Sequence, residues 1–214
     1  MTRIMLAAIL ATGGALLLVA SQADAYTLLT PNRAWATLPV PIEIHTGRDE
    51  TSIGAPDLDF GQTATADKID SLDSWNGKIP GITDAFTTSV SYSLGDGAPT
   101  VVFNDPLAIC TGSCLAATLT GYYSFDGVKY TIDDADIFVT KKASTKFDSE
   151  IEKPPGTCTS AFYIEGIMVH EVGHMLGLGH SATSTATMYS TVSTCDSGLR
   201  ILDTDDKNGI DVLY

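Results

Sequence analysis

Basic residues are scarce in this sequence of 214 residues: 12 lysines and arginines stand against 26 aspartates and glutamates, a formal net charge of −14 at pH 7. Nucleic acids and anionic membrane surfaces are bound through cationic patches. We therefore expect a protein that binds neither nucleic acid nor membranes. The excess of carboxylates is typical of a solvated surface, and clustered aspartates are also candidate ligands for calcium.

Long apolar runs are also rare, and the one present lies at the N-terminus. It spans residues 4–20, follows Arg3 and leads to an Ala-Asp-Ala sequence. A short run with these flanks predicts a secretory signal peptide over residues 1–25, because a transmembrane helix requires a longer uninterrupted stretch. The remaining residues 26–214 predict one secreted, extracellular domain, which we expect to be a monomer.

Cysteine is limited to Cys110, Cys114, Cys158 and Cys195. No two of them stand in a CxxC spacing, so the sequence lacks the usual signature of a cysteine-bound zinc. An even number of cysteines in an exported chain favours disulfides, and three pairings are open from the sequence alone.

Histidine occurs four times, and three of the four lie in the sequence HEVGHMLGLGH that begins at His170. On a helix, His170 and His174 lie on one face and are able to point two imidazoles at a single ion. His180 is too far round a straight helix to join them. Gly177 can adopt a positive φ that ends the helix and lets the chain bring His180 to the same ion. Zinc accepts three such ligands and keeps a position for water.

Glu171 lies about 100° round the helix from the first histidine, beside the metal rather than on it. This position predicts a general base that takes a proton from zinc-activated water. The alternative is that the histidines are core residues. The opposite side of the same helix is apolar, with Ala161, Ile164, Met168, Val172 and Met175. We expect the helix to begin near Thr159 or Ser160, either of which is a suitable N-cap.

The pattern HExxHxxGxxH, followed by Met188 in the sequence Ala-Thr-Met-Tyr-Ser, resembles the metzincin clan of zinc endopeptidases and its methionine turn. The residue after the third histidine separates families of that clan. Here it is Ser181, and together with Tyr189 it is similar to the matrixins, whereas astacins carry glutamate and serralysins proline. The resemblance implies a zinc metalloendopeptidase that hydrolyses proteins or peptides, with Met188 as a structural floor beneath the metal.

The resemblance also implies an α+β fold, in which a twisted mixed sheet of about five strands carries a backing helix, the zinc helix and a C-terminal helix. We expect this catalytic domain over residues 35–214, after a short N-terminal segment, residues 26–34. The predicted strands are residues 40–46, 86–94, 100–103, 115–123 and 130–139, and the predicted backing and C-terminal helices are residues 65–75 and 202–214. Residues 141–156 are polar and predict a surface loop.

Leu115, Ala116 and Ala117 open the predicted strand at residues 115–123, whose Leu-Ala-Ala-Thr-Leu resembles the matrixin edge strand that pairs with an extended substrate. They are candidate substrate-binding residues, together with Tyr189. The alternative is a plain core strand, because alternation does not show whether a strand lies at an edge. The resemblance implies that the segment after Tyr189 forms the wall of the pocket for the side chain that follows the scissile bond.

Two metal predictions follow from the region between His45 and His170, which contains no histidine. Animal matrixins hold a second, structural zinc there, so we expect a single zinc in this chain. Asp133, Asp134 and Asp136 are candidate calcium ligands, and the alternative is that they are merely solvated. His45 is expected to be exposed and not to be a ligand.

The inferred fold favours two disulfides, Cys110–Cys114 around a tight loop and Cys158–Cys195 between the two walls of the site. No cysteine precedes Cys110, so the propeptide cysteine that keeps many matrixins latent is not expected.

Two other functions are consistent with the sequence. An inactive relative that only binds peptides is disfavoured by the presence of Glu171, and a metzincin of another family is disfavoured by Ser181 and the third histidine.

Overall fold

The computed structural model describes residues 25–38, 40–45, 75, 77, 83–87, 94–103, 105–140, 145, 147–149 and 155–214. The predicted signal peptide, apart from its last residue, lies outside these ranges. So do most of the predicted backing helix and the side chain of His45.

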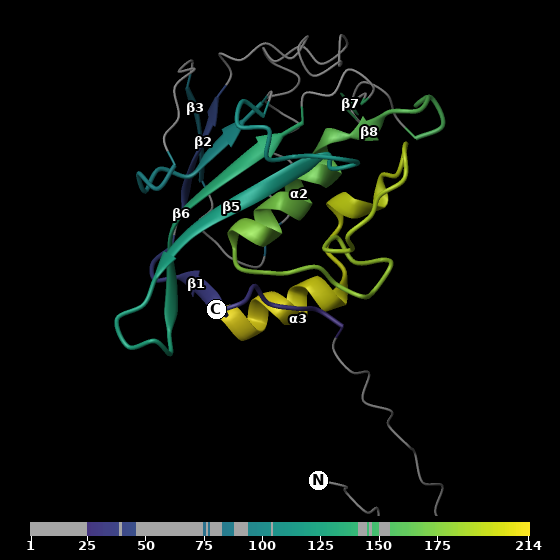
Figure 1. Ribbon diagram of the computed structural model, residues 1–214. Coiled ribbons are helices and arrows are strands. Elements are labelled where there is room, and N and C mark those ends of the chain that lie inside the picture. The colour runs from purple at the N-terminus through teal and green to yellow at the C-terminus, as the bar shows by residue number, and fades with distance from the viewer. Residues whose placement is uncertain are drawn as a thin grey trace, which may run out of the picture.

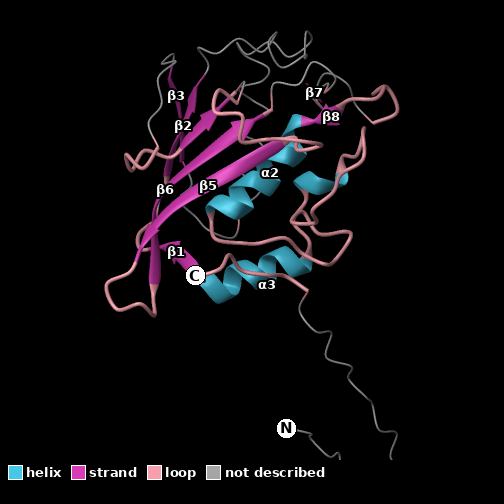
Figure 2. Ribbon diagram, viewed as in Figure 1, coloured by secondary structure: helices cyan, strands magenta, loops and turns pink. Residues whose placement is uncertain are grey.

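A curled mixed β-sheet forms one layer of the fold (Figures 1 and 2). Its strands are β1 (Arg33–Trp35), β2 (Pro41–His45), β3 (Thr83–Thr87), β4 (Thr100–Val102), β5 (Ala116–Tyr123) and β6 (Tyr130–Val139). The order is β3-β2-β4-β6-β5, and β1 pairs with the beginning of β6 on the same side as β4. All pairs are parallel except β5 with β6, which is antiparallel.

The predicted strands agree with the sheet in most places. β6 has the predicted bounds, and β2 and β4 fall within theirs. β5 pairs only with β6 among the described residues, so it is an edge strand of the described sheet. The strand predicted over residues 86–94 is wrong at its C-terminal end, because β3 ends at Thr87 and Leu94 lies in a turn. Residues 88–93 lie outside the described ranges.

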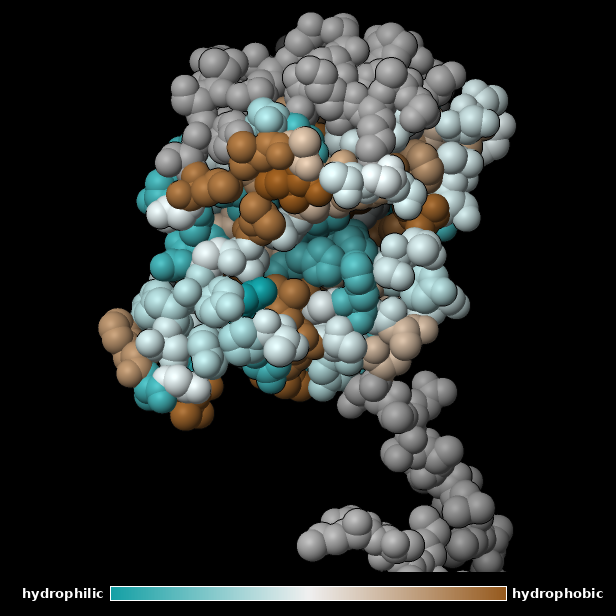
Figure 3. Space-filling view, viewed as in Figure 1, coloured by the Kyte–Doolittle hydropathy of each residue, from teal (hydrophilic) through white to brown (hydrophobic). Residues whose placement is uncertain are grey.

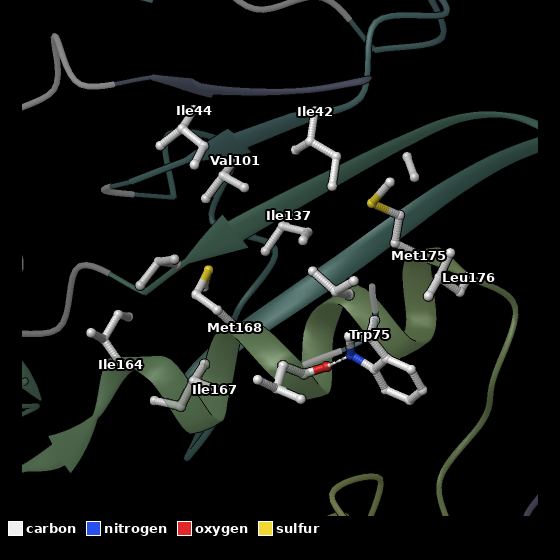
Figure 4. Close-up of a cluster of buried hydrophobic side chains, with 14 of the residues drawn as sticks. Ile42, Ile44, Trp75, Val101, Ile137, Ile164, Ile167, Met168, Met175 and Leu176 are labelled. Carbon is white, nitrogen blue, oxygen red and sulfur yellow. Dashed lines mark hydrogen bonds between the residues drawn. The ribbon is translucent and has the colours of Figure 1, made fainter. Parts of the chain in front are cut away.

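Helix α2 (Ile164–Met175) packs across the sheet, and the hydrophobic core lies between the two layers (Figure 4). Alternate residues of the strands supply one side of the core, and the apolar side of α2 supplies the other. The labelled side chains in Figure 4 include Ile42, Ile44, Val101 and Ile137 from the sheet and Ile164, Ile167, Met168 and Met175 from α2. Trp75 is fully buried beside them, and its Nε1 donates to the carbonyl of Val169 at 2.7 Å. Trp75 is the one residue of the predicted backing helix that the structure describes, and it is helical.

The predicted start of the zinc helix is wrong by about one turn. α2 begins at Ile164, its N-cap is Tyr163, and no side chain caps it. Phe162 and Tyr163 form strand β8, which pairs with β7 (Phe147–Asp148). Ser160 has φ +56°, which is incompatible with the first turn of a helix.

Strand β7 also corrects the prediction of a surface loop over residues 141–156. Phe147 is 3% exposed and belongs to the core, and its neighbours Asp148 and Ser149 are buried as well. Phe147 and Ile151 are the only large apolar residues in the polar stretch 141–156, and two such residues are too few to show the periodicity of a strand.

Helix α3 (Thr204–Leu213) confirms the predicted C-terminal helix. Asp203 caps it and forms a reciprocal capping box with Asp206. The N-terminal segment runs along this part of the molecule (Figure 1), where the amide of Tyr26 donates to Asp205 at 2.9 Å. At the other end of α3, the hydroxyl of Tyr214 donates to the carbonyl of Leu176 at 3.0 Å.

Both favoured disulfides are present, Cys110–Cys114 and Cys158–Cys195. Among the described residues, no helix is long and apolar enough to cross a membrane.

Candidate metal centre and cleft

The structure brings His170, His174 and His180 together. The first two lie one turn apart on α2, and the chain reverses after Met175 because Gly177 adopts φ +107°. Ring centroids are 4.7 Å apart for His170 and His174, 5.3 Å for His170 and His180, and 4.9 Å for His174 and His180. One ring nitrogen of each lies within 4.8 Å of the others, and no other group of three potential ligands occurs among the described residues.

Backbone carbonyls fix the orientation of two of the rings. Nδ1 of His170 donates to the carbonyl of Thr187 at 2.7 Å, and Nδ1 of His174 donates to the carbonyl of Leu178 at 2.8 Å. Since a carbonyl only accepts, Nδ1 carries the proton and Nε2 keeps its lone pair. Each ring therefore presents a nitrogen that is suited to a metal ion.

Burial keeps these imidazoles neutral. It lowers the pKa of His170 to about 4, with a further contribution from the nearby His174. It also lowers the pKa of His174 to about 4, and it lowers the pKa of His180. Three neutral imidazoles with converging nitrogens are the donor set that zinc prefers in catalytic sites, so the residues present fit this metal.

Met188 forms the floor below α2. It is 1% exposed, and a side chain at Gly173 would collide with its sulfur and with the ring of Trp75. Asp206 holds the turn from below, because its carboxylate accepts from the amide of Met188 at 3.0 Å and from that of Thr187 at 2.8 Å. The carbonyl of Thr187 in turn positions His170, so α3 supports the metal centre through this turn.

Glu171 lies beside the histidine cluster and is 5% exposed. The hydroxyl of Thr118 on β5 lies 2.6 Å from Glu171 Oε2 and 3.1 Å from the carbonyl oxygen of Glu171. A hydroxyl has one proton to donate, and the shorter distance favours donation to the carboxylate of Glu171. Burial raises the pKa of Glu171, and the neighbouring His170 and the hydrogen bond from Thr118 oppose that rise.

A cleft of about 740 Å³ runs between β5 and the segment that follows the methionine turn. Hydrophilic side chains gather in its middle on the face shown in Figure 3. The candidate substrate-binding residues Leu115, Ala116, Ala117 and Tyr189 all line it. The cleft is lined by the apolar residues Leu115, Phe162, Ile167, Val192 and Leu199 and also by Leu29, Arg33 and Thr120. Leu199 lies beside Gly166 in the first turn of α2, whereas Leu29 bonds to Gly177 just beyond its last turn, so the two groups lie toward opposite ends of the cleft.

Thr118, Arg33 and Asp206 were not singled out by the sequence. Thr118 and Arg33 lie in or near strand-forming stretches, and Asp206 looks like an ordinary residue of an acidic helix N-terminus. Each of these residues contacts the site from a distant part of the chain, and the spacing of residues within a short stretch of sequence does not predict such a contact.

The aspartates of β6 are not simply solvated. Asp133 is exposed, but Asp134 and Asp136 are 3% and 1% exposed. Asp136 accepts from the hydroxyl of Thr100 at 2.5 Å, and Asp134 accepts from the amide of Gly95 at 2.6 Å. Burial raises the pKa of Asp136 to about 6. These carboxylates do not form a second group of three converging ligands within the described part of the chain.

Comparison with known proteins agrees with this geometry. Residues 115–214 match the family model of the matrixins, a stretch that includes β5, β6, α2, the methionine turn and α3. Metalloendoproteinase 2-MMP of Arabidopsis thaliana is 47% identical over 58 residues, which are 26% of this chain and 15% of the relative.

Two further plant relatives match longer stretches. Metalloendoproteinase 1 of Glycine max is 35% identical over 100 residues, 43% of this chain and 31% of the relative. Metalloendoproteinase 4-MMP of Arabidopsis thaliana is 32% identical over 96 residues, 42% of this chain and 27% of the relative. The chain thus spans less than a third of the length of each of these relatives.

The α+β fold and the histidine cluster above a buried methionine agree with the metzincin resemblance. Residues 115–214 are matrixin-like, as the sequence resemblance predicts.

Proposed function

We propose that this protein is a secreted zinc endopeptidase in which His170, His174 and His180 hold one zinc ion and Glu171 is the general base. The observation that carries the proposal is the convergence of three neutral imidazoles next to a buried carboxylate in an open cleft. The plant relatives, which are all named metalloendoproteinases, also support it.

The edge strand β5 binds the substrate as an added strand. Its outer edge has no partner among the described residues, and it lines the cleft. Main-chain hydrogen bonds to β5 hold an extended peptide with little dependence on its sequence. The apolar end of the cleft, between Leu115 and Leu199, receives an apolar side chain that follows the scissile bond.

Zinc, when bound, supplies a Lewis acid that acidifies water and polarises the scissile carbonyl. Glu171 accepts the proton of the attacking water and returns it to the departing amine. Thr118 holds the carboxylate of Glu171 in one orientation during these transfers. The two Nδ1 contacts to carbonyls hold His170 and His174 in the tautomer that binds a metal.

Hydrolysis of quenched fluorescent peptides, with and without a chelator, tests this function. We expect cleavage that stops on chelation and returns with added zinc. Glu171→Ala is expected to keep zinc and lose at least about a hundredfold in kcat, because only proton transfer is removed. His174→Ala is expected to lose the metal itself, which atomic absorption measures. Full turnover by Glu171→Ala would exclude Glu171 as the general base.

The rival function is peptide binding without hydrolysis. It predicts that labelled peptides bind the zinc-loaded protein and are recovered intact, which mass spectrometry would detect.

The remaining features of the proposal concern the molecule outside the site. We propose export with cleavage after Ala25, a monomer, and no binding to nucleic acid or membranes. N-terminal sequencing of protein from the medium and light scattering test the first two. Calcium at Asp133, Asp134 and Asp136 stays a prediction, which equilibrium dialysis of the zinc-loaded protein against radioactive calcium checks.

A further inference from the structure

Arg33 lies at the end of the cleft that is remote from the apolar pocket. Its backbone pairs with Tyr130 in the β1–β6 ladder, and its side chain lines the cleft beside Leu29 and Thr120. The guanidinium carbon lies 4.2 Å from the centroid of the Tyr122 ring on β5. Stacking on an aromatic face fixes the plane of a guanidinium and leaves its edge available for hydrogen bonds.

Among the residues that the structure describes, this guanidinium has no anionic partner. Arg33 Nε is buried and has no hydrogen-bond partner, and among the described residues no carboxylate forms an ion pair with Arg33. Buried charged groups in folded proteins are normally paired. An unpaired arginine is the more notable here because the chain contains 26 acidic residues. The chain therefore keeps a positively charged donor group in its cleft without neutralising it.

The position of Arg33 relative to the histidines determines which part of a substrate it contacts. Thr118, which contacts Glu171, lies between Leu115 and Thr120 along β5. Thr120 lies toward the beginning of β6, where Arg33 pairs with Tyr130, so Leu115 and Arg33 lie on opposite sides of Glu171 along this strand. The apolar pocket receives the side chain after the scissile bond in the proposed function, on which this inference rests. A peptide extended along β5 then places the residues before the scissile bond next to Arg33.

We propose that Arg33 is a specificity-determining residue that binds the carboxylate of a glutamate or aspartate located before the scissile bond of the substrate. A carboxylate accepts two parallel hydrogen bonds from the edge of a guanidinium, which is a geometry that lysine does not reproduce. The partial burial of Arg33 limits screening by salt and makes the interaction stronger than an exposed ion pair. The favoured substrate class is thus an acidic peptide segment followed by an apolar residue.

Matched pairs of quenched fluorescent peptides test this inference on the zinc-loaded protein. The members of a pair differ only by glutamate or glutamine at one of the positions before the scissile bond. We expect kcat/KM to favour glutamate about tenfold at one of these positions. The preference is expected to shrink as the salt concentration rises.

Variants of Arg33 test whether this residue causes the preference for glutamate over glutamine. Arg33→Gln is expected to bring the glutamate-to-glutamine ratio close to one, and Arg33→Glu is expected to favour glutamine. A ratio cancels any general loss of activity in the variant. Lys129→Gln removes a positive charge from the exposed β5–β6 turn, outside the cleft, and is expected to keep the wild-type ratio.

Several outcomes would overturn the inference about Arg33, and they can be distinguished from a failure of the proposed hydrolysis. Cleavage of the peptides without discrimination at any position, or full discrimination in Arg33→Gln, removes the role of Arg33. If no peptide is cleaved, the proposed function fails. In that case the same pairs are titrated against the zinc-loaded Glu171→Ala protein by fluorescence anisotropy. The absence of tighter binding by a glutamate peptide then overturns the inference by itself.

Discussion

Single side chains decide how the chemically active groups of this site are oriented. Glu171 is placed beside the histidines by the geometry of α2, but the direction of its carboxylate is set from β5 by Thr118. The strand proposed to bind substrate therefore also positions the proposed general base. The two proposed roles are separable, because an added peptide would contact the backbone of β5, whereas Glu171 contacts the side chain of Thr118.

Thr118→Val keeps the shape of the side chain and removes its hydroxyl. We expect kcat to fall roughly tenfold with little change in KM, since a hydrogen bond to a charged group is lost and the peptide-binding edge is retained. Thr118→Ser restores the hydroxyl and is expected to restore kcat. Steady-state kinetics with one peptide measures all three proteins. A valine variant with the kcat of the wild type, or a serine variant that loses as much as the valine variant, would show that the hydroxyl of Thr118 does not act on Glu171.

Asp136 is a second residue whose environment has a measurable consequence. Burial raises its pKa from 3.8 to about 6. The folded state thus binds this proton more tightly than the unfolded chain, so the contribution of Asp136 to stability decreases as pH rises from about 4 to about 6. A shift of about two pKa units corresponds to roughly 3 kcal/mol.

Asp136→Asn removes this titration and keeps an acceptor for Thr100. We expect the variant to gain stability relative to the wild type between about pH 4 and about pH 7. Urea unfolding at both pH values measures the difference in unfolding free energy between the variant and the wild type. The histidines titrate in both proteins, so their contribution cancels in this difference. A difference that is the same at both pH values would contradict the assignment.

At the scale of elements, the reversal after α2 is the feature on which the metal centre depends. Gly177 has φ +107°, and a side chain there would collide with the carbonyl oxygen of Arg33. The turn is therefore constrained by its own backbone and by strand β1, which packs against it. His180 reaches the cluster only if both conditions are met.

Gly177→Ala is expected to destabilise the protein by more than about 2 kcal/mol and to weaken zinc binding, because the turn must shift. Gly127→Ala is the matched control. Gly127 also has a positive φ, +71°, but nothing lies near its missing side chain, so we expect a loss of about 1 kcal/mol and no change in zinc. Chemical unfolding and metal analysis measure the two effects. Normal zinc affinity in Gly177→Ala would show that the turn tolerates a side chain.

The sequence predicted elements well where one local signal dominates. The alternation of Val40, Ile42 and Ile44 at strand β2 and the histidine spacing on α2 each arise from a single periodicity. The N-terminal end of α2 was misplaced because Phe162 and Tyr163 pair with β7, and a pairing partner about 15 residues away leaves no trace in local spacing. The roles of Thr118, Arg33 and Asp206 were not predicted for the same reason, because each depends on a contact with residues that are distant in sequence.

At the scale of the whole molecule, covalent and noncovalent links join segments that are distant in sequence. The Cys158–Cys195 disulfide closes a loop of 37 residues around α2 and the methionine turn, whereas Cys110–Cys114 spans only 4. The longer loop restricts the unfolded chain more strongly.

We therefore expect the paired variant Cys158→Ser/Cys195→Ser to lose about 4 kcal/mol, and Cys110→Ser/Cys114→Ser to lose about 2 kcal/mol. Thermal unfolding of the zinc-loaded proteins compares them directly. A larger loss in the second pair would mean that loop closure does not determine the ranking.

The two ends of the cleft are built from separate stretches of chain: residues 189–199 contribute to one end and residues 29–33 to the other, with the histidines between them. Because the backbone of Leu29 and Arg33 packs against the Gly177 turn, side chains that face the cleft, rather than whole stretches of backbone, are the parts to exchange in order to alter recognition at one end while keeping the histidine cluster in place.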